Sequence, residues 1–199
     1  MKILLLGGFP GSGKTAVLNR VIRAIARLEG TSAVIEGEIG PMEADSAPGG
    51  EGRIAVEPLF RGCACCKLSG DPVQAVGRIA DEVNPDWLVA EMTGLAMMDG
   101  VCAAFRRGGR PDIPVHPVCV VDAARFGVLS GVVGPVLEGQ LRGAELVLVN
   151  KADVVRPTGE QLDLIARWAD GARVRTVSAG KTEDTVLWQI ILEGIGEAQ

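Results

Sequence analysis

A glycine-rich segment near the start of the chain has the residue types and spacing of a phosphate-binding loop. Its glycines let backbone N–H groups converge on an anion, and the amino terminus of a following helix adds favourable partial charge. In this pattern the lysine reaches the β- and γ-phosphates, and the Ser/Thr hydroxyl binds Mg²⁺. The alternative is a glycine-rich turn that merely joins a strand to a helix. The predicted nucleotide-binding residues are Gly8, Gly11, Ser12, Gly13, Lys14 and Thr15, with Thr15 as the Mg²⁺ ligand.

A second polar group, Asn150, Lys151 and Asp153, directly follows the apolar residues 146–149. A carboxylate at Asp153 can accept hydrogen bonds from N1–H and the 2-amino group of guanine, where adenine has no donor. Each charge-assisted hydrogen bond contributes about 1.5–3 kcal/mol, so a preference for GTP of ~100-fold is expected. The alternative is a polar turn at the end of a strand. Backbone contacts to the guanine are expected from Ser178 and Ala179.

Two acidic residues end other apolar runs. Glu91 follows residues 87–90, and an acid at this place can bind the Mg²⁺ shell while the Gly94 N–H senses the γ-phosphate. Loss of that phosphate would release the following segment, 91–98. The alternative for Glu91 is a buried acid that caps the next helix. Asp122 faces the same nucleotide end, but an N-cap role for the following helix is at least as well supported.

Cys63, Cys65 and Cys66 place three thiols within four residues. In a reducing compartment such thiols suit Zn²⁺, Co²⁺ or Ni²⁺. The adjacent Cys65 and Cys66 point in different directions in regular structure, so one ion would use two of the three. Glu36, Glu38, water, the nucleotide or a second subunit would complete the coordination. Transient metal carriage is the preferred interpretation, and a structural metal, thiol redox chemistry and plain packing stay open.

Strand and helix patterns alternate along the chain. This alternation indicates one α/β domain over residues 1–199, a P-loop NTPase with a mostly parallel sheet covered by helices on both faces. Residues 37–62, rich in Gly, Pro and charge, are expected to form a long functional loop. Strands are expected at residues 2–6, 32–35, 87–90, 115–121, 145–149 and 173–177. Helices are expected at residues 14–28, with Leu28 on the buried face, at 72–83, after a Thr158–Gln161 capping box, and at 182–192.

Composition narrows the function classes. Hydrophobic residues make up 47% of the chain, yet no apolar run reaches the ~18 residues of a membrane span. Residues 3–6 are too short for the core of a signal peptide, so we expect a cytoplasmic protein without a membrane partner. A net charge of −5 and an aromatic content of 4% argue against nucleic-acid binding. Cys102 and Cys119 are expected in the core, and His116 is expected to be structural.

These motifs together resemble the metallochaperone GTPases that include the CobW, HypB and UreG proteins. The resemblance runs from Lys2 to the last helix, and the segments 36–40 and 62–66 are most similar to the CobW branch. It implies GTP hydrolysis coupled to delivery of a metal or a metal cofactor into a client metalloprotein. A corrinoid protein as client and a nucleotide-dependent homodimer belong to the same expectation. The resemblance places metal ligands at Cys63, Cys65 and Cys66 and switch acids at Glu36, Glu38 and Asp45.

The chain also departs from the family pattern. Gly37 and Ile39 stand where the family usually has Asn and Phe, which is expected to loosen the first switch. The carboxy-terminal domain common in the CobW branch is expected to be absent, so a free-standing GTPase domain would serve a narrow client. Two other functions stay open: a nucleotide-gated metal-sensing or partner-binding module with incidental hydrolysis, and a P-loop small-molecule kinase. Asn150 and Asp153 argue against the kinase.

Overall fold

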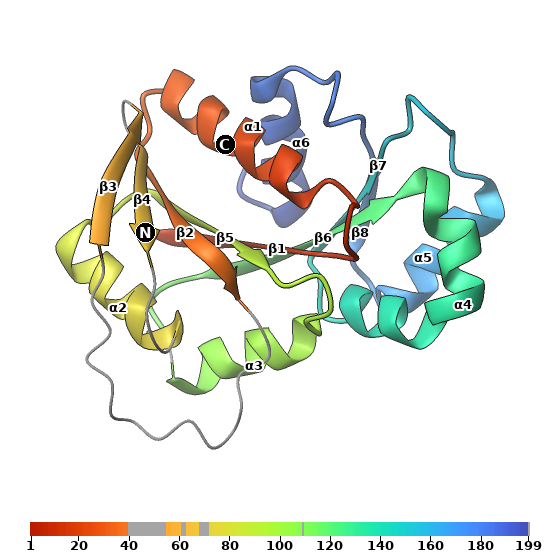
Figure 1. The fold of residues 1–199 in the computed structure, drawn as a ribbon, viewed down its shortest axis with the longest axis horizontal. Helices are drawn as coiled ribbons and strands as arrows, with labels where there is room; N and C mark the ends of the chain where they lie inside the picture. The colour runs from red at the N-terminus through yellow and green to blue at the C-terminus, as the bar shows by residue number, and fades with distance from the viewer. Residues whose placement is uncertain (40–54, 61–62, 68–71, 109, 199) are drawn as a thin grey trace.

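A computed structural model of the chain describes the backbone of residues 1–39, 55–60, 63–67, 72–108 and 110–198, and the side chains of 1–35, 73–107 and 110–198. Its strands are β1 (Lys2–Gly7), β2 (Ser32–Ile39), β3 (Ala55–Phe60), β4 (Cys63–Lys67), β5 (Trp87–Met92), β6 (Val115–Asp122), β7 (Leu146–Asn150) and β8 (Arg173–Thr176). They form one sheet in the order β3-β4-β2-β5-β1-β6-β7-β8 (Figure 1). Within the described residues every neighbouring pair is parallel except β3 and β4.

Six helices in the described residues cover the two faces of this sheet. They are α1 (Lys14–Arg27), α2 (Pro72–Glu82), α3 (Met98–Gly108), α4 (Ala123–Leu141), α5 (Gly159–Trp168) and α6 (Asp184–Ile195). Helices α1 and α6 pack on one face, and α2, α3, α4 and α5 on the other (Figure 1). Each face therefore has its own apolar core, and the expected fold class is confirmed.

Strand β1 shows why the central strands are apolar throughout. Its side chains alternate between the two faces, so Ile3 and Leu5 join one core while Leu4 and Leu6 join the other. A parallel strand buried on both faces must therefore be a continuous apolar run. This pattern predicts β1, β5, β6 and β7 correctly, with ends that differ by one or two residues.

The segment expected to be a long loop is partly strand. β2 continues to Ile39 and β3 occupies Ala55–Phe60, while residues 40–54 lie outside the described part. The three-thiol segment forms β4 and pairs in parallel with β2, with Cys65 beside Val34 and Cys66 beside Ile35. Non-local pairing thus overrides a local composition typical of loops.

Local expectations at helix ends have mixed outcomes. The Thr158–Gln161 capping box of α5 is confirmed, as is the N-cap of α4, where the Asp122 carboxylate accepts from two backbone N–H groups. The prediction that Leu28 is buried is wrong: α1 ends at Arg27, and Leu28, at the C-cap, is 61% exposed. The sequence pattern predicts no bounds for α3 and α4.

Cys102 and Cys119 are buried free thiols, as expected for core residues. Burial raises the pKa of Cys102 to about 11 and that of Cys119 to about 12, so both stay protonated near neutral pH. None of the helices in the described part of the chain combines the length and apolar character that crossing a bilayer requires.

Candidate nucleotide site

The loop between β1 and α1 depends on glycine at both ends. Gly8 has a φ of +130°, and a Cβ there would collide with the Val120 carbonyl oxygen of β6. Gly13, with a φ of +102°, is the N-cap of α1, and a Cβ there would collide with the Asn150 amide. In the described residues no side chain caps α1, and its first turn contains no acid. Its free N–H groups are therefore available to an anion.

Lys14, Thr15 and Glu91 meet where β1 and β5 end. Lys14 is only 5% exposed; its ammonium donates to the Gly8 carbonyl at 2.9 Å and lies 3.8 Å from a Glu91 oxygen. The Thr15 hydroxyl donates to the other Glu91 oxygen at 2.9 Å. A buried ammonium needs such partners. The hydroxyl and the carboxylate are hard oxygen ligands, so this pair fits Mg²⁺ bound beside phosphates.

Gly94 lies beside the phosphate loop, and a side chain of α4 donates a hydrogen bond to its carbonyl. A Cβ on Gly94 would lie 2.5 Å from the Pro10 ring. The Gly94 carbonyl accepts a 2.7 Å hydrogen bond from the Gln140 amide of α4. Gln140 is 1% exposed, and its own side-chain oxygen has no partner in the described structure. The sequence carried no signal for Gln140, because its partner lies on a different element.

The Asp122 carboxylate binds two cationic side chains that also contact the phosphate loop. Its carboxylate accepts from Lys151 Nζ and from Arg125 Nε, both at 2.7 Å. The same Lys151 donates to the Gly11 carbonyl, and Arg125 donates to the Pro10 carbonyl, again at 2.7 Å. Burial raises the pKa of Asp122, but the hydrogen bonds from Lys151 and Arg125 outweigh it and hold that pKa below its ordinary value. Asp122 therefore stays ionised.

Asn150 ties the phosphate loop to the loop after β8. Its amide nitrogen donates to the Ser12 carbonyl at 3.0 Å, and its oxygen accepts from the Ala179 N–H at 2.8 Å. The side chain is buried. Asn150 thus positions two segments that are predicted to bind the nucleotide relative to each other, and its own contact with the nucleotide stays a prediction.

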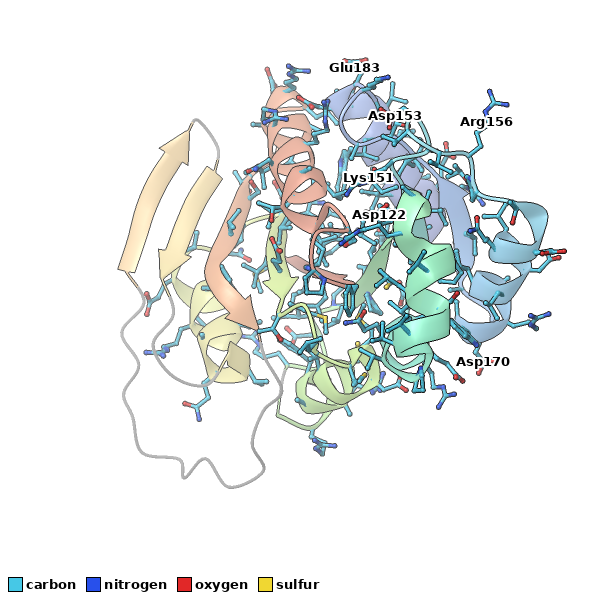
Figure 2. All side chains as sticks on the ribbon, turned by 45° about the vertical axis from the view of Figure 1, so that its right-hand side comes forward. Asp122, Lys151, Asp153, Arg156, Asp170 and Glu183 are labelled. Carbon is cyan, nitrogen blue, oxygen red and sulfur yellow. The ribbon has the colours of Figure 1, made fainter. Side chains whose placement is uncertain are left out.

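Asp153 lies beyond Lys151 on the same side of the molecule as Asp122 (Figure 2). It forms an ion pair with Lys181 at 3.3 Å. Desolvation raises the pKa of Asp153, but hydrogen bonds from Lys181, the backbone and Ser178 outweigh it and lower that pKa. The carboxylate is therefore ionised and can act as an acceptor. Lys181 is a neighbour that the sequence interpretation did not include.

The loop after β8 is fastened to α1. Arg20 donates to the carbonyls of Thr182 at 2.5 Å and Gly180 at 2.9 Å, and to Asp184 at 3.0 Å. Asp184 is buried and also pairs with Arg23 at 3.1 Å. The helix that begins at the phosphate loop therefore also positions the loop predicted to contact guanine.

The predicted transition-metal ligands lie at strand positions whose side chains are outside the described part. Glu36 and Glu38 belong to β2, and Cys63, Cys65 and Cys66 to β4, while Asp45 lies in the undescribed segment. Among residues with described side chains, no group of three or more His, Cys, Asp or Glu could hold a metal ion.

Backbone register nevertheless places the cysteine strand relative to β1. Cys66 pairs with Ile35, Ile35 with Ala90, and Ala90 with Leu5, so one row crosses from β4 through β2 and β5 to β1. Three strand spacings amount to roughly 14 Å. Glu91 follows Ala90 directly, so the strand that carries the Thr15 partner runs between the phosphate loop and the cysteines.

A glycine-rich loop at the head of a parallel sheet, with a buried lysine and a second polar loop beside it, defines a P-loop nucleotide-binding domain. Residues 2–176 match the family described as CobW/HypB/UreG, nucleotide-binding domain, and the chain belongs to this family.

Curated relatives are similar over most of this chain. It is 26% identical to the zinc chaperone YjiA of Escherichia coli K12, over 89% of this chain and 58% of that protein. It is 25% identical to the zinc chaperone CobW of Sinorhizobium, over 78% of this chain and 52% of that protein. The chain thus spans just over half the length of these two relatives.

Solved structures agree on the fold. A zinc-bound YjiA GTPase from E. coli is 25% identical, with a TM-score of 0.59 over 92% of this chain and 58% of that one. HypB from Helicobacter pylori in complex with nickel has a TM-score of 0.61 at 16% identity, over 99% of this chain and 88% of that one.

Proposed function

We propose that this chain is a GTPase that couples GTP binding and hydrolysis to delivery of a transition metal, Zn²⁺ first, to a client metalloprotein. Family membership and the names of the zinc chaperone relatives support the metal and the client. Among the described contacts, one arrangement carries the proposal. Glu91 accepts a hydrogen bond from Thr15 at the phosphate loop. Ala90, the residue before Glu91 in β5, lies in the same cross-strand row as Cys66 of β4.

In this proposal the phosphate loop supplies positioning and charge. The free N–H groups at the start of α1 and the Lys14 ammonium hold the β- and γ-phosphates, and Asp153 accepts from guanine. Mg²⁺, held by Thr15 with Glu91 behind it, would supply charge neutralisation between phosphate oxygens. Gly94, already against Pro10, offers its N–H to the γ-phosphate. Turnover in isolation is expected within a few decades of ~10⁻⁴ s⁻¹, because no activating arginine is assigned.

The coupling step follows from the strand arrangement. Binding of GTP fixes Glu91 and Gly94 at the end of β5, which lies next to β2 and two strands from β4. We expect Glu36, Glu38 and the thiols of β4 to change their metal affinity in response. The cargo ion is then released to the client after hydrolysis.

The test measures Zn²⁺ affinity by competition with a chromophoric chelator. Three states are compared: without nucleotide, with GDP·Mg²⁺, and with a non-hydrolysable GTP analogue and Mg²⁺. We expect the analogue to change the Zn²⁺ affinity about fivefold or more, and linkage requires Zn²⁺ to change the affinity for the analogue by the same factor. Equal Zn²⁺ affinity in all three states would overturn the proposal.

Matched cysteine variants show whether the thiols are responsible. The double substitution Cys65→Ala with Cys66→Ala should abolish tight Zn²⁺ binding and leave GTP affinity nearly unchanged. Cys102→Ala serves as the control, because Cys102 is a buried core thiol on α3. Tight Zn²⁺ binding that survives in the double variant would remove the thiols from the proposal.

A further inference from the structure

A cavity of about 400 Å³ lies near the amino ends of the central strands, at the edge of the sheet opposite the nucleotide site. Its lining includes Ile3 and Val115, at the amino ends of β1 and β6, whereas the phosphate loop follows the carboxyl end of β1. Helix α3 and residues 110–113 form much of the remaining wall. The volume falls within the range typical of small-molecule sites.

The deep part of this cavity is apolar. Val76, Cys102, Phe105 and Ile113 line it, and all four are buried. The Cys102 thiol stays protonated, since burial raises its pKa to about 11, and so adds no charge to the wall. An occupant of this region must therefore present an apolar body.

Three charged side chains line the same cavity: Arg106, Arg110 and Glu145. They are exposed or half-exposed, which places them at the mouth. Two of them already have partners outside the cavity lining. Arg110 pairs with Asp81 at 2.5 Å and Asp112 at 3.0 Å, and Glu145 bonds to His116 at 2.8 Å.

Arg106 is left as the uncommitted charge at the mouth. Within the described structure no carboxylate pairs with it, and it follows the buried Phe105 directly in α3. A guanidinium next to an apolar cavity complements an anion, since its fixed fork of donors suits carboxylate, sulfonate or phosphate oxygens.

We propose that this cavity is a second binding site, separate from the nucleotide site, for a small organic anion whose apolar body fills the cavity and whose anionic group contacts Arg106. The committed ligand class is an aromatic or branched aliphatic monoanion. Charge complementarity at Arg106 distinguishes it from a neutral apolar ligand of the same shape.

Two fluorescent probes with nearly the same body separate these cases. 8-Anilinonaphthalene-1-sulfonate carries an anionic group, and N-phenyl-1-naphthylamine lacks it. Titration of the full chain should show one site for the sulfonate probe, and saturating GTP·Mg²⁺ should not displace it. Displacement by GTP would locate the probe in the nucleotide site and overturn the proposal.

Variants then assign the site. Arg106→Gln should weaken binding of the sulfonate probe about tenfold and leave the neutral probe unchanged, because only the charge-assisted contact is lost. The control Arg107→Gln alters an exposed neighbouring arginine that does not line the cavity, and should change neither probe.

A cavity-filling variant, Cys102→Phe, should weaken both probes. If Cys102→Phe does not fold, the Arg106 and Arg107 pair still decides the matter. Equal sulfonate-probe affinity in wild type and Arg106→Gln would overturn the anion assignment, and sulfonate binding that Cys102→Phe leaves unchanged would overturn the cavity itself.

Discussion

Asp122 performs two tasks with one carboxylate. It caps α4 by accepting from the N–H groups of Ala124 and Arg125, and it holds Lys151 and the Arg125 side chain against the phosphate loop. The cap needs only an acceptor oxygen, whereas the two cations need the negative charge. Substitutions that keep one task and remove the other therefore separate the two contributions.

We expect Asp122→Asn to keep the cap and lose the charge. Asparagine caps helices about as well as aspartate, so the cap itself should be kept. The free energy of unfolding should fall by about 1–3 kcal/mol at pH 7, because the charge-assisted hydrogen bonds from Lys151 and Arg125 are weakened. GTP affinity should also fall, because Lys151 and Arg125 no longer hold the Gly11 and Pro10 carbonyls. Denaturant unfolding and nucleotide titration measure the two effects, and Asp122→Ala should cost about 1 kcal/mol more.

The lowered pKa of Asp122 predicts how the stability difference between wild type and Asp122→Asn depends on pH. The folded-state pKa of Asp122 is lowered, so its stabilising contribution is fully present above the unfolded value near 3.9 and is lost as the pH falls through the folded pKa. The difference in unfolding free energy between wild type and Asp122→Asn should stay constant from about pH 7 to 5 and shrink below about pH 4. A difference that grows on acidification would contradict this assignment.

Asp153→Asn should change the base preference. The new amide can donate to the C2 carbonyl of xanthine, so affinity should move from GTP towards xanthosine triphosphate by roughly 100-fold in their ratio. Competition against a fluorescent nucleotide measures the ratio. Asp170→Asn is a suitable control because Asp170 lies far from Asp153 in Figure 2 and tolerates asparagine at its φ of +45°. An unchanged GTP preference in Asp153→Asn would exclude it from base recognition.

At the scale of elements, α4 connects two parts of the nucleotide site. Its first turn contacts the phosphate loop through Arg125, and its last turn contacts the Gly94 segment through Gln140. Between them the helix is interrupted at Val133, with φ −127° and ψ 31°, just before Pro135. A helix with an anchor at each end and a kink between can respond to both the phosphate loop and the Gly94 segment.

Gln140→Met tests this connection. Methionine keeps the length of the side chain and removes the unpaired buried oxygen, which offsets part of the cost of the hydrogen bond lost at the half-buried Gly94. We expect stability within about 1 kcal/mol of wild type. Affinity for a GTP analogue should fall about two- to tenfold while GDP affinity is unchanged, since only the γ-phosphate requires an oriented Gly94.

The control for that variant is Gln189→Met on the exposed side of α6, where the Gln189 amide donates to Glu193 at 3.1 Å. It should change neither nucleotide affinity. If Gln140→Met weakens GDP and the GTP analogue equally, Gln140 acts on the phosphate loop in general and not on the γ-phosphate segment.

Elements with a self-contained pattern were predictable from sequence. β7 is a continuous apolar run, and α5 begins with a capping box, so both follow from local physics. In α4, Gly127, Gly131 and Pro135 interrupt an almost wholly apolar sequence, so no helical periodicity appears. β4 depends on pairing with β2, which no local pattern records.

The residues of the candidate site likewise fall into those that a local motif predicts and those that depend on distant partners. The residues of the phosphate loop and the Asn150–Asp153 group follow motifs whose spacing is itself the signal. Arg125, Gln140 and Lys181 have their functions only through partners distant in the sequence or on another loop. One chain without its contacts therefore could not single them out, although Lys181 lies three residues after Ser178 in a loop already expected to contact guanine.

At the scale of the whole molecule, the phosphate loop lies at the edge of the sheet that separates the two apolar cores. It leaves β1, whose side chains belong to both cores, and enters α1, which packs against α6. Asn150 and Arg20 connect it further to the loop after β8. A ligand that fixes this loop should therefore stabilise the complete domain and not only its own contacts.

Nucleotide-linked stability tests this expectation and the base assignment together. A ligand at 100 times its Kd adds about 2.7 kcal/mol to the free energy of unfolding, which raises the Tm of a domain of this size by roughly 5–11 °C. GTP·Mg²⁺ should produce that shift, and ATP·Mg²⁺ at the same concentration should produce little, because adenine has no donors for Asp153. The double cysteine variant at positions 65 and 66 should respond to GTP like wild type, because β4 lies three strands from β1.

Equal Tm shifts with ATP and GTP would contradict guanine specificity. Analysis of the reaction products tests the reaction class separately, because a phosphorylated metabolite among them would favour a kinase over a GTPase.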